Sequence, residues 1–69
     1  MEELPVRLPI KLSQFLKLSQ LAETGGHATE FITAGEVFVN GRREVRRAHK
    51  LGDGDVVAVG GCEVRVTRA

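Results

Sequence analysis

Aromatic and sulfur-containing residues are scarce in this chain. Among its 69 residues there is no tryptophan, no tyrosine and only three phenylalanines. A module that binds nucleic acid by stacking successive bases on aromatic side chains is thereby excluded. Cys62 is the only cysteine, which excludes an internal disulfide and a zinc site built from cysteines alone. We expect Cys62 to be a small buried apolar residue in a final strand.

Long hydrophobic runs are also absent. No stretch approaches the ~20 apolar residues of a membrane-spanning helix. The first ten residues contain no apolar run typical of a signal peptide. We therefore expect a cytoplasmic protein with no membrane partner. We also expect a monomer. The length predicts a single domain over residues 1–69 and excludes a dinucleotide-binding fold or a barrel enzyme.

Groups suited to catalysis or metal binding are few and unsuitably spaced. His27, His49 and Cys62 match no zinc-binding pattern. Asp53 and Asp55 lie in a glycine-rich segment, where we interpret them as turn-forming acids rather than as a general acid/base pair. The glycine pairs lack the Gly-Lys-Ser/Thr ending of a phosphate-binding P-loop. We predict that the protein is not an enzyme and has no cofactor and no metal.

The net charge of +1 conceals a strongly basic segment, residues 42–50. Half of the ten lysines and arginines of the chain lie in this basic stretch, against one acid, Glu44. The rest of the chain carries more acids than bases, which indicates a localised anion-binding patch. A solvated loop is the alternative interpretation. Val45 and Leu51 are the expected apolar anchors of the segment.

The amino-terminal half is predicted to contain one strand and two helices. Apolar residues alternate along residues 4–8, which indicates a short strand, and Pro5 favours a position at a sheet edge. Helical spacing of apolar residues then predicts a helix over about residues 10–18 and a second over about residues 26–34. Two short helices joined by a tight loop form a helical hairpin.

The ends of the second helix and its core contacts are also predicted. Thr24 is a candidate N-cap, and Gly35 suits the left-handed position that follows a helix. We expect the helices and the sheet to be joined by four apolar residues: Phe15, Leu16, Phe31 and Ile32.

The carboxy-terminal half is predicted to be a small sheet. Residues 37–39 alternate as a strand, with Phe38 on the face opposite to its neighbours, beneath a loop or the amino-terminal segment. Asn40-Gly41 favours a type I′ hairpin turn. Residues 56–59 and the segment from Cys62 onward predict two further strands around a second hairpin turn. The predicted class is α+β: a short edge strand, a two-helix hairpin, then a small antiparallel sheet.

The motifs between Lys11 and Val59 occur in a characteristic order. A Lys-Leu-x-x-Phe-Leu-Lys helix precedes Ala-x-x-Phe-Ile-x-x-Gly, then Val-Phe-Val-Asn-Gly, the basic stretch, and Leu-x-x-Gly-Asp-Val-Val. This order resembles the RNA-binding domain named for small-subunit ribosomal protein four, also called the alpha-L motif. Small free-standing bacterial members share the Gly-Gly before the second helix and the Arg-Arg-x-x-Lys-Leu run at residues 46–51.

The resemblance implies a non-catalytic protein that contacts structured RNA, ribosomal or transfer RNA, through a basic surface. The contacts would lie on a concave surface between the helical hairpin and the basic stretch. The candidate contacts are Lys11, Gly25, Gly26, Arg42, Arg43, Arg46, Arg47 and Lys50. The alternative is a protein-interaction module whose arginines bind an acidic protein partner.

One departure from the resemblance concerns the start of the second helix. Many family members carry Ser-Arg where this chain has Thr24 and Gly25, so a cation is lost from a contact site. Gly25 and Gly26 would instead offer backbone N–H groups to a phosphate at the helix N-terminus. The alternative is that these glycines only satisfy the dihedral angles of a turn.

Overall fold

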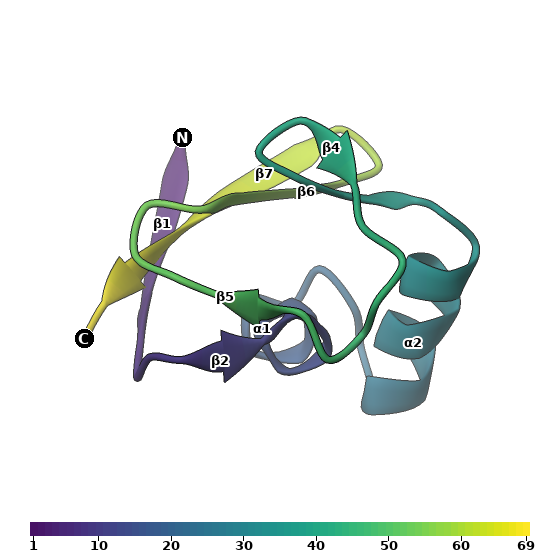
Figure 1. The fold of residues 1–69 in the computed structure, drawn as a ribbon, viewed down its shortest axis with the longest axis horizontal. Helices are drawn as coiled ribbons and strands as arrows, with labels where there is room; N and C mark the ends of the chain where they lie inside the picture. The colour runs from purple at the N-terminus through teal and green to yellow at the C-terminus, as the bar shows by residue number, and fades with distance from the viewer.

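The computed structural model describes residues 1–69 as two helices and seven strands (Figure 1). In chain order these elements are β1 (Glu2–Val6), β2 (Ile10–Lys11), α1 (Leu12–Leu18), α2 (Gly25–Thr33), β3 (Val37–Val39), β4 (Arg42–Arg43), β5 (Lys50–Leu51), β6 (Val56–Val59) and β7 (Cys62–Arg68). The predicted α+β class is confirmed, and neither helix is long and apolar enough to cross a membrane.

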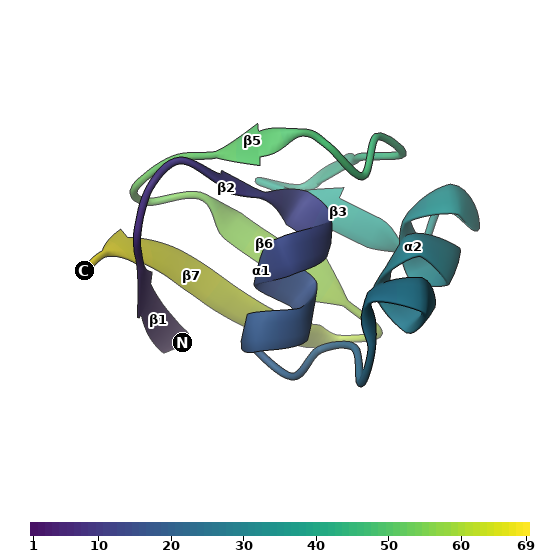
Figure 2. The same cartoon turned by 90° about the horizontal axis from the view of Figure 1, so that it is seen from below.

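Five strands form the main sheet, in the order β1-β7-β6-β3-β4. β3, β4, β6 and β7 pair with antiparallel neighbours, whereas β1 lies at one edge, parallel to β7. The sheet is therefore mixed. A parallel pair needs a long connection, and here the chain passes through both helices between β1 and β7. β2 and β5 form a separate two-stranded sheet, and α1 packs on one face of the main sheet (Figures 1 and 2).

The helices begin and end close to the predicted positions. α1 starts two residues later than predicted, because Ile10 and Lys11 pair with β5 as an extended segment. α2 starts at Gly25, where Thr24 is confirmed as the N-cap: its hydroxyl oxygen accepts from the backbone N–H of His27 at 3.0 Å. Gly35 follows α2 with a φ of 76°, in the predicted left-handed conformation.

The hairpin turn between β3 and β4 is confirmed by its dihedral angles. Asn40 and Gly41 have φ values of 53° and 83°, as a type I′ turn requires. Asp55 supports this turn, since its carboxylate accepts from the side-chain amide of Asn40 at 3.0 Å and from the backbone N–H of Gly52 at 2.8 Å. Asp53 accepts from the backbone N–H of Arg68, so both aspartates stabilise turns.

The core is one cluster of 15 buried apolar residues drawn from both helices and both sheets. Phe15, Leu16 and Ile32 are fully buried in it, as predicted. Phe31 is less buried than expected. It is only half-buried, and its ring contacts that of His27 at a centroid distance of 4.3 Å. α2 turns only a narrow face, centred on Ala28 and Ile32, toward the core.

Three further expectations about burial need correction or refinement. Cys62 is exposed, because it follows the hairpin turn at the uncovered end of β7. Val45 is 55% exposed and anchors nothing, whereas Leu51 is buried as predicted. Phe38 does face away from the core, and the guanidinium of Arg43 lies 5.5 Å from its ring centroid.

Candidate functional site

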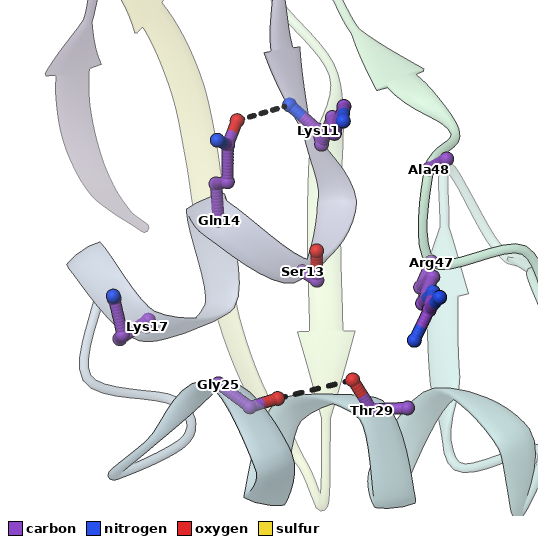
Figure 3. A pocket seen from close by; sticks show the side chains of 8 residues that line it. All are labelled: Lys11, Ser13, Gln14, Lys17, Gly25, Thr29, Arg47 and Ala48. Atoms are coloured by element: carbon purple, nitrogen blue, oxygen red, sulfur yellow. Dashed lines mark hydrogen bonds between the residues drawn. The ribbon is translucent and has the colours of Figure 1, made fainter.

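A hollow of about 310 Å³ lies where α1, the start of α2 and the end of the basic stretch meet (Figure 3). Its lining is almost entirely polar and contains no acidic residue. We call it the basic hollow; it is lined by Lys11, Ser13, Gln14, Lys17, Gly25, Thr29, Arg47 and Ala48. The sequence predicted a concave basic surface between the helical hairpin and the basic stretch, and a hollow does open there.

The loop from the basic stretch is held against the start of α1 by two backbone hydrogen bonds. The N–H of Leu12 donates to the carbonyl of His49 at 2.8 Å, and the N–H of Ser13 donates to the carbonyl of Arg47 at 3.2 Å. The first N–H groups of a helix have no partner within the helix, so the loop carbonyls satisfy them. This capping places Arg47 beside Lys11, although 36 positions separate them in the sequence.

Three cations from different segments line the basic hollow: Lys11 of β2, Lys17 of α1, and Arg47 of the loop. None of them forms an ion pair. Figure 3 shows the Arg47 side chain directed toward α2, near Thr29. Unpaired like charges around one concavity repel one another, and an anion bound between them would relieve that repulsion.

The cross-strand register adds a fourth cation at the rim. Lys11 of β2 lies directly opposite Lys50 of β5, while the neighbouring pair, Ile10 and Leu51, is buried. Like charges directly opposite on paired strands are destabilising. The buried pair sets the register, and the two lysines next to it therefore add to the positive potential of this surface.

The start of α2 supplies backbone donors on the other side of the basic hollow. The N–H groups of Gly25 and Gly26 lie in the first turn, where a helix provides no acceptor. Neither glycine has a positive φ, and a Cβ on Gly25 would meet no atom within 4 Å. The alternative that these glycines satisfy unusual turn dihedrals is therefore wrong. Only Gly25 lines the basic hollow.

The remaining candidates lie apart from the basic hollow. Arg43 donates from Nε to the carbonyl of Gly35 at 2.9 Å and covers Phe38. Arg42 and Arg46 line a second depression beside the β3–β4 turn, together with His49. The eight candidates thus divide into two groups: Lys11, Gly25, Arg47 and Lys50 at the hollow, and Arg42, Arg43 and Arg46 near β4, with Gly26 in neither.

Glu44 is the most highly hydrogen-bonded side chain in the basic stretch. Its carboxylate accepts from Nε and from the backbone N–H of Arg46, both at 3.0 Å, and from Nη2 at 3.3 Å. Its Oε1 also lies 3.4 Å from Nδ1 of His49. The side-chain and backbone hydrogen bonds from Arg46 lower the pKa of Glu44 to about 2. The same side-chain hydrogen bond raises the pKa of Arg46.

Five lining residues were not among the candidates: Ser13, Gln14, Lys17, Thr29 and Ala48. Lys11, Gln14 and Lys17 recur every three residues, and this spacing puts them on one polar face of the first helix, away from its apolar stripe. The spacing does not show that this face borders a hollow. Thr29 carried no such signal. It reaches the hollow because it lies one turn after Gly25, to whose carbonyl its hydroxyl donates at 3.0 Å.

Comparison with known proteins first establishes the fold. The solution structure of YbcJ from E. coli, described as having an alpha-L motif involved in RNA binding, superposes with a TM-score of 0.69 and 32% sequence identity. The match covers 96% of this chain and 84% of YbcJ. The fold of the present chain is thus the alpha-L fold.

The family follows from two sequence matches. The S4 domain family matches residues 6–67 of the chain. The Bacillus subtilis (strain 168) protein described as "Probable ribosome maturation protein RlbA" is 46% identical over 52 residues, which is 75% of this chain and 73% of that protein. The chain belongs to the S4 domain family, which confirms the resemblance identified from its motifs.

Proposed function

We propose that this protein binds structured RNA, of ribosomal or transfer origin, through contacts to the phosphate backbone centred on the basic hollow. The observation that carries the proposal is the meeting of Lys11, Lys17 and Arg47 around one concavity that contains no acid. The relatives support it, because one is described as RNA-binding and another as a ribosome maturation protein. The protein acts by binding, without catalysis.

The proposed mechanism is electrostatic. A phosphate in the basic hollow would meet two ammonium groups, one guanidinium and the backbone N–H of Gly25. Lys50, directly opposite Lys11 on β5, adds to the positive potential of this surface. Without tyrosine or tryptophan, recognition depends on phosphate positions and RNA shape rather than on base stacking.

The experiment that tests this proposal is a salt titration of RNA affinity, by fluorescence anisotropy with a labelled single strand and a labelled hairpin. Each phosphate contact to a single strand contributes ~0.7 to the slope of log K against log salt, so three hollow cations predict a slope of about −2. All five cations of the basic stretch acting alone would give about −3.5.

Two outcomes would contradict the proposal. A slope near zero would exclude phosphate contacts as the source of binding. Equal affinity for polyglutamate at matched salt would favour an acidic protein partner instead of RNA. Tighter binding to the hairpin than to the single strand would support the preference for structured RNA.

A further inference from the structure

The basic stretch contains one acid, and that acid is turned inward. Glu44 opposes five cations within residues 42–50, and its negative charge should weaken any interaction with phosphate. Its side chain is nevertheless only 13% exposed, and its carboxylate receives the three hydrogen bonds from Arg46 and the contact with His49 described above. Because donors of the protein itself already contact this carboxylate, we expect it to stabilise the conformation of its own segment.

The contacts of Glu44 connect the main sheet to the loop that caps α1. Its backbone N–H donates to the carbonyl of Val37 in β3 at 2.9 Å, which fixes Glu44 to the sheet. Its carboxylate accepts hydrogen bonds from Arg46 and lies 3.4 Å from Nδ1 of His49. These two residues are the ends of a turn closed by the His49 N–H, which donates to the Arg46 carbonyl at 3.1 Å. Both residues between them, Arg47 and Ala48, line the basic hollow, and Arg47 is the charged one.

The same turn supplies both carbonyls that cap α1. Those of Arg47 and His49 accept from the first two N–H groups of the helix. A change in the turn would therefore move the Arg47 backbone relative to Lys11 and Lys17, the other two cations of the basic hollow. The carboxylate of Glu44 contacts both ends of this turn, through hydrogen bonds from Arg46 and through the 3.4 Å approach of Nδ1 of His49.

We propose that Glu44 is a positioning residue for RNA binding, which holds the 46–49 turn so that Arg47 enters the basic hollow. The inference rests on the proposed function, because it assumes that the hollow binds RNA phosphate. In this arrangement Arg46 serves mainly to hold the turn. Glu44 itself never touches the RNA.

This role predicts a change in RNA affinity opposite to the one that net charge alone predicts. If only net charge mattered, Glu44→Gln would remove a repulsive charge and tighten RNA binding. If Glu44 positions the turn, the same substitution misplaces Arg47 and weakens binding by about fivefold to tenfold, somewhat less than the complete loss of one charged contact. Glutamine keeps the size of the side chain but has only one oxygen to accept hydrogen bonds.

The experiment compares RNA affinity of wild type, Glu44→Gln and Glu63→Gln at matched salt and matched folded fraction. Glu63 provides the control: it is exposed in β7, has no ion pair and loses the same charge on substitution. We expect Glu63→Gln to bind as tightly as wild type or slightly more tightly, and Glu44→Gln to bind more weakly. Tighter or unchanged binding by Glu44→Gln would overturn the proposal.

A second measurement separates positioning from general loss of structure. In an Arg47→Ala background, Glu44→Gln should cause no further weakening, because the side chain that it positions is gone. If Glu44→Gln weakens binding equally in both backgrounds, Glu44 does not act through Arg47 and the inference is wrong. Wild-type affinity reports separately on the proposed function: if wild type fails to bind RNA with the expected salt slope, it is the proposed function that fails.

Discussion

The two halves of the basic stretch carry similar charge but differ in what their cations contact. In the first half, residues 42–46, Arg43 bonds to the Gly35 carbonyl at 2.9 Å and Arg46 pairs with Glu44 at 3.0 Å. In the second half, residues 47–50, neither Arg47 nor Lys50 forms an ion pair. Arg43 and Arg46 thus serve the fold, whereas Arg47 lines the basic hollow and Lys50 lies beside it, opposite Lys11.

The difference shows that charge density locates a basic surface without identifying its free cations. A guanidinium that already bonds to a carboxylate or a carbonyl must give up that partner before it can bind a phosphate. Which arginines have such partners depends on neighbours that come from distant segments, here the end of α2 for Arg43. The following predictions test this division of the basic stretch.

The largest expected effect is on RNA affinity. Arg47→Ala should weaken binding about tenfold or more, because a hydrogen bond to a charged group contributes ~1.5–3 kcal/mol. Arg43→Ala should weaken it less than about threefold, since its guanidinium already has a protein partner. Affinity for the same RNA hairpin at one salt concentration checks both values. Equal losses in the two variants would show that the two halves contribute alike.

For stability we expect the opposite order, with a larger effect of Arg43→Ala than of Arg47→Ala. Arg43→Ala removes the hydrogen bond to Gly35 and the contact with Phe38, which should lower the free energy of unfolding by about 1 kcal/mol. Arg47→Ala removes no side-chain hydrogen bond and should change it by less than about 0.5 kcal/mol. Urea denaturation of the two variants provides the measurement. A larger loss in Arg47→Ala would mean that its side chain, too, is structural.

A smaller effect is expected at the opposite wall of the basic hollow. Gly25→Ala should leave the fold intact, because a Cβ there meets nothing within 4 Å and alanine favours a helix. Its methyl group would stand where a phosphate approaches, so we expect RNA affinity to fall about threefold, by analogy with a partly blocked contact. Gly26→Ala is the matched comparison, one residue further and outside the hollow lining, and should affect affinity less.

The smallest effect is the pH dependence that Glu44 gives to stability. Its pKa is lowered from 4.5 to about 2 in the folded protein, so its stabilising contribution is complete above pH 4.5 and is lost as the pH falls through about 2. Wild type should therefore exceed Glu44→Gln in melting temperature at neutral pH, and the difference should disappear toward pH 2. A difference that is constant over this range would exclude ionisation of Glu44 as its origin.

Local features of the fold were predictable where short-range chemistry decides them. The Asn40-Gly41 turn, the Thr24 N-cap and the left-handed Gly35 each depend on residues adjacent in sequence. Burial was less predictable. Cys62 shares the alternation of its strand yet lies where nothing covers the sheet, and Phe31 has helical spacing yet lies at the margin of the face that α2 buries.

The candidate site could be predicted only in part. Composition and motif order indicated a basic surface and the S4 domain family, and Lys11, Gly25 and Arg47 were correctly expected to lie near one concavity. Lys17 and Thr29 were missed, because a polar residue on a helix surface looks the same in sequence whether it faces solvent or a hollow. Likewise, nothing in the sequence indicated that the Glu44 side chain is directed toward the protein rather than toward solvent.

By itself, the sequence determined the order of the elements, the chemistry of the turns, the concentration of positive charge and the family. These properties depend on residue identity and on interactions over a few positions. Only the tertiary structure decided which cations are free, because hydrogen bonds such as those of Arg43 to Gly35 and of Ser13 to Arg47 join segments that the sequence separates. Availability for an RNA phosphate is therefore a property of the folded chain.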